Sequence, residues 1–147
     1  MKLPKRLGAV ALVLFASTAC TSSRAFREAK EEESLSHWDL AVIKYSQALE
    51  SEPGSSRYQI SLSNAKRKAA QAHFERGKVY RSSGHADLAV VELQQTIALD
   101  PTNHYAELEL VKARDEASRA AAERDGALIR LQSIENNLGR RGLRLRR

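Results

Sequence analysis

Residues that could do chemistry are few in this sequence and stand far apart. The four histidines are His37, His73, His85 and His104. None of them stands at metal-ligand spacing from another histidine, from a cysteine or from a cluster of carboxylates. No nucleophile–base motif, zinc-protease motif or phosphate-binding loop occurs either. We therefore expect no enzyme, no cofactor and no metal, and we expect His73 to be a hydrogen-bonded imidazole on a packed helical face.

The single cysteine, Cys20, is distinguished by what precedes it. A short basic start (1–6), an uncharged apolar run (7–16) and three small residues (17–19) form the layout of a bacterial secretory signal. The apolar run reaches about 15 Å as a helix, half of a hydrocarbon core of about 30 Å. No permanent membrane span is therefore expected there.

With Cys20 directly after the small residues, this segment resembles a bacterial lipoprotein signal, although Ser17 stands where that family usually has a leucine. The resemblance implies that residues 1–19 are removed and that Cys20 is lipidated. Thr21, in place of an aspartate, implies an outer-membrane lipoprotein that faces the periplasm. An ordinary secretory signal is the alternative, but an unpaired thiol in an oxidising compartment argues against it.

The body of the chain contains an internal sequence repeat with a constant period, so that position 39 of the first unit corresponds to position 87 of the second. The segment 39–43 (DLAVI) recurs as 87–91 (DLAVV), and Pro53 recurs as Pro101. Apolar residues at the same helical spacing share one face in each unit. They are Ala41, Tyr45, Ala48 and Leu49 in the first unit, and Ala89, Leu93, Thr96 and Ile97 in the second.

These units resemble the tetratricopeptide repeat (TPR) family, in which small residues stand where two paired helices cross and a proline follows the second helix. The matching residues are Ala29, Ala41, Tyr45, Ala48 and Pro53, then Gly77, Tyr80, Ala89 and Pro101. Glu32 at the place of Tyr80, Thr96 at the place of an alanine and the long period depart from the family pattern. The resemblance implies an all-α fold of TPR-like antiparallel helix pairs, which is an α-solenoid fragment.

Each unit is longer than a repeat of the TPR family, and this extra length predicts extended first helices. The stretch 55–82 has no proline and keeps one apolar face, which predicts a single long helix. The expected parts are a signal helix over 1–19, a TPR-like helical domain over 20–138 and a basic disordered tail over 139–147. Within the domain the repeats cover about 22–53 and 70–101, and an incomplete third unit covers 103–138. The apolar residues of that third unit close on the chain itself, meet a partner, or belong to a shortened form of something longer.

Two side chains recur on the first helix of each unit, because Phe26 and Lys30 return as Phe74 and Lys78. In the TPR family these helices line the concave surface that holds peptides. The resemblance therefore implies that Phe26, Lys30, Phe74, Lys78 and Arg81 bind a protein partner. The alternative is that both phenylalanines pack between the repeats. No small-molecule substrate is expected.

The net charge of +6 is concentrated at the two ends, and the body between them is slightly acidic. Nucleic-acid binding is therefore not expected of the folded part, although the arginine-rich tail could bind nucleic acid or anionic lipid. We expect a membrane-anchored TPR scaffold lipoprotein that mediates protein–protein interaction in the bacterial cell envelope. A lipoprotein signal before two such repeats is also similar to the region preceding the pore domain of some secretin-type proteins, in type II secretion and type IV pilus systems. That similarity implies a part in assembling a secretion or pilus complex or, alternatively, a truncated N-terminal region of such a pore protein.

Overall fold

The structure of the chain is a computed structural model that describes residues 24–144. The expected signal segment 1–19, the expected lipidation site Cys20 and residues 145–147 lie outside the described residues. Within the described range the chain is helical apart from short turns, and it contains no strand. The expected all-α fold is therefore confirmed for this part of the chain.

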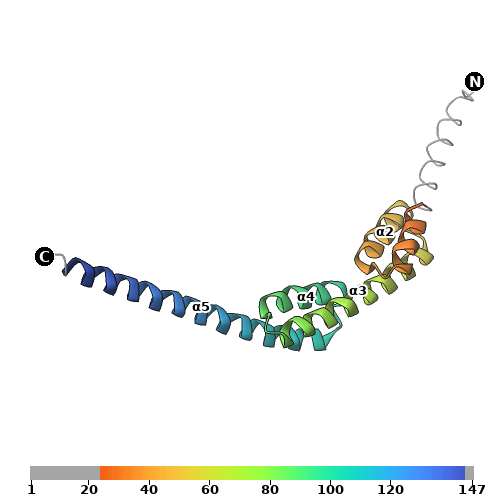
Figure 1. Ribbon diagram of the computed structural model, residues 1–147. Helices are drawn as coiled ribbons and strands as arrows, with labels where there is room; N and C mark the ends of the chain where they lie inside the picture. The colour runs from red at the N-terminus through yellow and green to blue at the C-terminus, as the bar shows by residue number, and fades with distance from the viewer. Residues whose placement is uncertain (1–23, 145–147) are drawn as a thin grey trace, which may run out of the picture.

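Helices follow one another along the described residues and pack in sequence. The first covers 24–34, and it is followed by α2 (Trp38–Ser51), α3 (Ser56–Ser82), α4 (Ala86–Leu99) and α5 (His104–Arg144). Helix α2 packs on α3, α3 on α4, and α4 on α5. The molecule is elongated, and α5 projects far beyond the end of α4 (Figure 1). Residues 139–144, which we expected to begin a disordered tail, continue α5 as a helix.

The period of the sequence reappears in the bounds of the helices. Helices α2 and α4 begin and end at equivalent positions of their units, and α3 and α5 begin at equivalent positions. The helix over 24–34 likewise ends at the position that corresponds to the end of α3. Helix α3 therefore serves two units, because its first part packs on α2 and its last part packs on α4.

The same turn closes the first helix of each unit. Ser36 has a φ of 59° and Gly84 a φ of 81°, so both lie in the left-handed region. In each turn the amide of the following histidine donates to the carbonyl five residues earlier, at 2.9 Å in both units. This pattern satisfies the last carbonyls of the helix and turns the chain back along it.

Small residues allow the two helices of each unit to cross closely. Ala41 and Ala89 are fully buried on the second helices, and Ala29 and Gly77 are buried on the first. A Cβ atom placed on Gly77 would lie 2.9 Å from Cγ of Leu93, which is closer than two carbon atoms can approach without a shift. The crossing of α3 and α4 is therefore set by the absence of a side chain at Gly77.

An ion pair joins the helices of each unit, and its polarity is reversed between the units. In the first unit Nζ of Lys44 lies 2.7 Å from Oε2 of Glu28. At the equivalent positions of the second unit, Nε of Arg76 lies 2.9 Å from Oε2 of Glu92. A helix that paired with the wrong unit would bring Glu28 to Glu92 or Arg76 to Lys44. Because like charges repel, this arrangement favours the native pairing over an exchange of helices.

Candidate functional site

An aromatic cluster fills the space beside the first helix of the first unit. The ring of Phe26 stacks on Tyr58 with centroids 4.8 Å apart and lies tilted against Tyr45 at 5.4 Å. The guanidinium of Arg57 covers the same ring, 4.4 Å from its centroid. Phe26 is only 5% exposed as a result, and it packs in the core instead of lining a surface.

The second unit has the same phenylalanine without its ring neighbours. Leu93 and Ala106 stand at the positions equivalent to Tyr45 and Tyr58, and Phe74 is only half-buried. A groove of about 510 Å³ lies beside Phe74, between α3 and α5. We call it the α3–α5 groove, and its lining includes Phe74, Lys78, Val79, Arg81, Tyr105 and Glu109.

The lysine of the α3–α5 groove is held over its aromatic floor. Nζ of Lys78 lies 5.4 Å from the centroid of the Phe74 ring and 3.0 Å from Oε2 of Glu75. In the first unit Lys30 lies over Phe26 in the same way, at 5.9 Å. The cation–π arrangement therefore recurs in both units, and in the second it borders the α3–α5 groove.

Arg81 closes the other side of the groove by joining α3 to α5. Its Nη2 lies 2.9 Å from Oε2 of Glu109, and its Nη1 lies 3.0 Å from Oε1 of Glu116. Nε of Arg81 and Oε2 of Glu109 are buried without an aligned hydrogen bond, so the close Arg81–Glu109 contact is Coulombic. A hydrogen bond from Lys112, opposed by burial and assisted by the charge of Arg81, holds the pKa of Glu109 below its usual range. Glu109 is therefore an anion that keeps Arg81 in place.

The α3–α5 groove brings together Phe74, Lys78 and Arg81, three of the five residues expected to bind a partner. Phe26 and Lys30 lie in the first unit and do not line this groove. Both cations of the groove are already paired with carboxylates of the chain. The groove therefore offers an aromatic floor with a charge-balanced rim, not a strongly basic surface.

Tyr105 and Glu109 line the groove, and the sequence pattern had not singled them out. Tyr105 is 76% exposed at the start of α5. The repeat indicates that the two phenylalanines differ in their surroundings. Ala106 stands at the position equivalent to Tyr58, so the ring that stacks on Phe26 has no counterpart beside Phe74.

A second polar cluster surrounds His73. Its Nε2 lies 3.0 Å from Oδ1 of Asp39 in α2, and its Nδ1 lies 2.8 Å from Oε2 of Glu92 in α4. Burial raises the pKa of Glu92, but hydrogen bonds from His73 and Arg76 outweigh burial and leave that pKa below its usual range. The expectation of a hydrogen-bonded histidine on a packed face is confirmed. Both ring nitrogens are used in joining three helices, so this cluster is structural.

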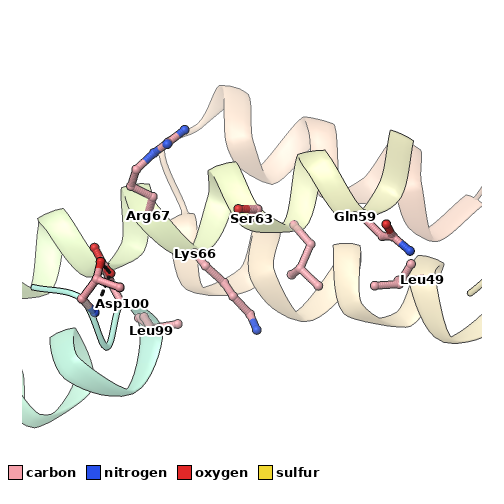
Figure 2. A pocket seen from close by; sticks show the side chains of 9 residues that line it. Leu49, Gln59, Ser63, Lys66, Arg67, Leu99 and Asp100 are labelled. Carbon is pink, nitrogen blue, oxygen red and sulfur yellow. Dashed lines mark hydrogen bonds between the residues drawn. The ribbon is translucent and has the colours of Figure 1, made fainter. Parts of the chain in front are cut away.

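Another groove, of about 480 Å³, lies where the C-terminal ends of α2 and α4 meet α3. Figure 2 shows Lys66 extending from α3 into the space between Leu49 and Leu99, while Arg67 points to the other side of the helix. The carboxylate of Asp100 accepts hydrogen bonds within its own turn. This groove therefore marks the junction between the two units and carries no aromatic floor.

Comparison with known proteins finds no protein-family model and no curated protein that matches the chain. Over residues 24–144 no group of three or more potential ligands could hold a metal ion. No helix in that range is long and apolar enough to cross a membrane. The support for the repeat and for the α3–α5 groove therefore comes from the residues and packing of this chain.

Proposed function

We propose that the chain is a membrane-anchored, TPR-like scaffold lipoprotein of the bacterial cell envelope, which holds an extended segment of a protein partner in the α3–α5 groove. The mechanism is surface complementarity, and no bond is made or broken. The lipid on Cys20 would keep the helical body close to the periplasmic face of the outer membrane. The similarity to the region before a secretin pore supports a place in the assembly of a secretion or pilus complex.

The single observation that carries this proposal is the difference between two otherwise equivalent units. The first unit fills the space beside Phe26 with Tyr45, Tyr58 and the guanidinium of Arg57. The second unit keeps the phenylalanine, has no ring at the positions of Tyr45 and Tyr58, and places Phe74 beside an open groove. An aromatic floor that is half-exposed in an open groove is a typical anchor point for a partner's side chain.

The chemistry of the groove defines the kind of segment that would fit. Phe74 and Val79 favour an apolar side chain at the floor. The rim combines Glu75 and Glu109 with Lys78 and Arg81, so the flanking residues of the partner would be polar without a strong net charge. A strongly acidic or basic peptide gains little here, because each cation of the rim is already paired.

Site-specific photocrosslinking in cells tests the proposal. A photoreactive residue at position 105, at the mouth of the groove, is expected to capture a partner in envelope fractions. The same group at Ile43, which is 51% exposed on α2, is the matched control outside the groove.

The substitution Phe74→Ala removes the aromatic floor of the groove and is expected to abolish the adduct from position 105. An adduct that survives Phe74→Ala, or that position 43 gives equally, would contradict the groove assignment. Metabolic labelling with a fatty acid, compared with Cys20→Ser, tests the anchor separately.

A further inference from the structure

The C-terminal part of α5 carries an apolar face that no helix of the described residues covers (Figure 1). Helix α4 buries Leu110 and Ala113. Beyond them Leu131 and Ile134 are 59% and 54% exposed. The exposed face is continuous with the packed one, because its residues follow at alternating intervals of three and four. That spacing is the a and d pattern of a coiled-coil seam.

The uncovered seam consists of residues 117–134 and holds Ala117, Ala120, Arg124, Ala127, Leu131 and Ile134. Small residues occupy most of its first half, and large apolar residues end its second half. A helix with this asymmetry packs best against a helix that runs in the opposite direction, because small residues then meet large side chains.

A further helix of the α4 type does not fit this face. In the two units of the structure the crossing position is held by Ala29 and Gly77, and both are buried. The equivalent residue on α5 is Asp125, which is exposed. A Cβ atom alone at Gly77 would lie 2.9 Å from Leu93, so an aspartate at such a crossing would clash and lose its hydration. The occupant of α5 must therefore pack in another way.

We propose that residues 117–134 of α5 form an antiparallel helix pair with the same segment of a second copy of the chain. The pairing sets Ala117 against Ile134, Ala120 against Leu131 and Arg124 against Ala127 of the second copy. Every layer combines a small residue with a larger one. The overlap over 117–134 spans about 27 Å. It starts just beyond Ala113, the last residue of the seam that α4 fully buries.

The charges beside the seam agree with this register. Glu123 lies opposite Arg130 of the second copy, and Arg114 lies opposite Glu135, so each contact occurs twice by symmetry. Moving the overlap one heptad toward the C-terminus sets Arg130 against Arg130. Moving it one heptad toward the N-terminus places the second copy over Leu110 and Ala113, which α4 already covers.

A parallel pair is disfavoured by the same residues. It sets Arg124 against Arg124 and leaves alanine against alanine at positions 117, 120 and 127. The antiparallel pair keeps one arginine in each of two layers, where the small Ala127 leaves room for its side chain to reach solvent. Polar residues at a seam lower stability and fix the register, so the dimer is expected to be weak and specific.

Sedimentation velocity of the full-length chain in a mild detergent, over a concentration series, measures this association. The intact chain is expected to form a dimer and no larger species. Leu131→Glu places a charge in the seam and is expected to give a monomer. Ser133→Glu adds the same charge on the opposite side of α5 and is expected to leave the dimer intact. A chain that is monomeric at millimolar concentration, or a dimer that survives Leu131→Glu, overturns the proposal.

Charge reversal tests the register and the direction of the helices. Glu123→Arg alone and Arg130→Glu alone are each expected to weaken the dimer about tenfold, because symmetry makes each repulsion twice. An equimolar mixture of the two variants is expected to recover the affinity. Both contacts of the mixed dimer join an acid to a base, whereas both contacts of either variant alone join like charges. If Glu123→Arg leaves the dimer unchanged, or if mixing restores nothing, the antiparallel register is wrong. Circular dichroism of each variant confirms that the helices remain.

Discussion

The close crossing of α3 and α4 makes a quantitative prediction about Gly77. Alanine favours a helix over glycine by about 1 kcal/mol, so Gly77→Ala should stabilise α3 if nothing else changed. The new Cβ atom would lie 2.9 Å from Cγ and 3.1 Å from Cδ2 of Leu93, a side chain that is fully buried. Overpacking of this kind costs about 1–3 kcal/mol. The two effects together predict a net loss of about 1 kcal/mol.

Gly126→Ala is the matched control, because it makes the same change inside a helix where no atom lies within 4 Å of the new Cβ. This variant should keep the whole propensity gain of about 1 kcal/mol. Native-state amide hydrogen exchange measures the opening free energy around each site. It is preferred to a global melt because Gly126 lies on α5 beyond Ala113, the last seam residue that α4 fully buries.

A double-mutant cycle identifies the cause of the expected loss. Leu93→Ala removes the atoms that the new Cβ would meet, so Gly77→Ala should cost less in that background than in the intact chain. If Gly77→Ala stabilises α3 as much as Gly126→Ala stabilises α5, the close approach of Leu93 does not limit the crossing. Asp125 would then no longer exclude a further α4-type helix from α5.

Four further positions test the turns and the polar cluster. Ser36→Gly should stabilise the chain by about 0.5 kcal/mol, because the strain energy of a left-handed serine exceeds the entropic cost of a more flexible unfolded chain. Gly84→Ser should destabilise the chain for the same reason. Urea denaturation measures both changes. His73→Ala should cost about 2 kcal/mol by leaving Asp39 and Glu92 without their shared partner, whereas a loss near zero would show that the cluster does not join the units. Since the folded pKa of Glu92 lies below its usual 4.5, its contribution is present above that pH and is lost as the pH falls further; Glu92→Gln should flatten this acid-side decline in a pH series of urea midpoints.

The sequence predicted the helices well because their signals are local. The uninterrupted stretch 55–82 became α3 (Ser56–Ser82), and the third unit expected from residue 103 begins at His104. The glycine at position 84 ends a helix as its type suggests, but the serine at position 36 adopts the same left-handed turn without that signal. Tertiary packing imposed the turn on Ser36, because the second helix of each unit must fold back in the same way.

The candidate site was predicted only in part. Phe26 and Phe74 are the same residue at the same place in the repeat, so the sequence pattern assigned them the same role. Their surroundings differ because Tyr58 stacks on the first ring, whereas Ala106 at the equivalent position offers no ring to the second. Tyr58 and Ala106, which make the difference between the two phenylalanines, each lie far along the chain from that phenylalanine and on a different helix. Such a contact is visible only when the helices are placed side by side.

The amino-acid sequence by itself determined the helical class, the period of the repeat and the small residues that permit close crossings, because these depend on local propensity and spacing. Tertiary structure alone decided which equivalent residues are covered, how the reversed pairs Glu28–Lys44 and Arg76–Glu92 match their helices, and where α5 loses its cover beyond Ala113. The physical reason is that burial and charge pairing depend on neighbours from other helices. In a repeated sequence those neighbours stand at equivalent positions, but the size of their side chains and the sign of their charges can differ between the units.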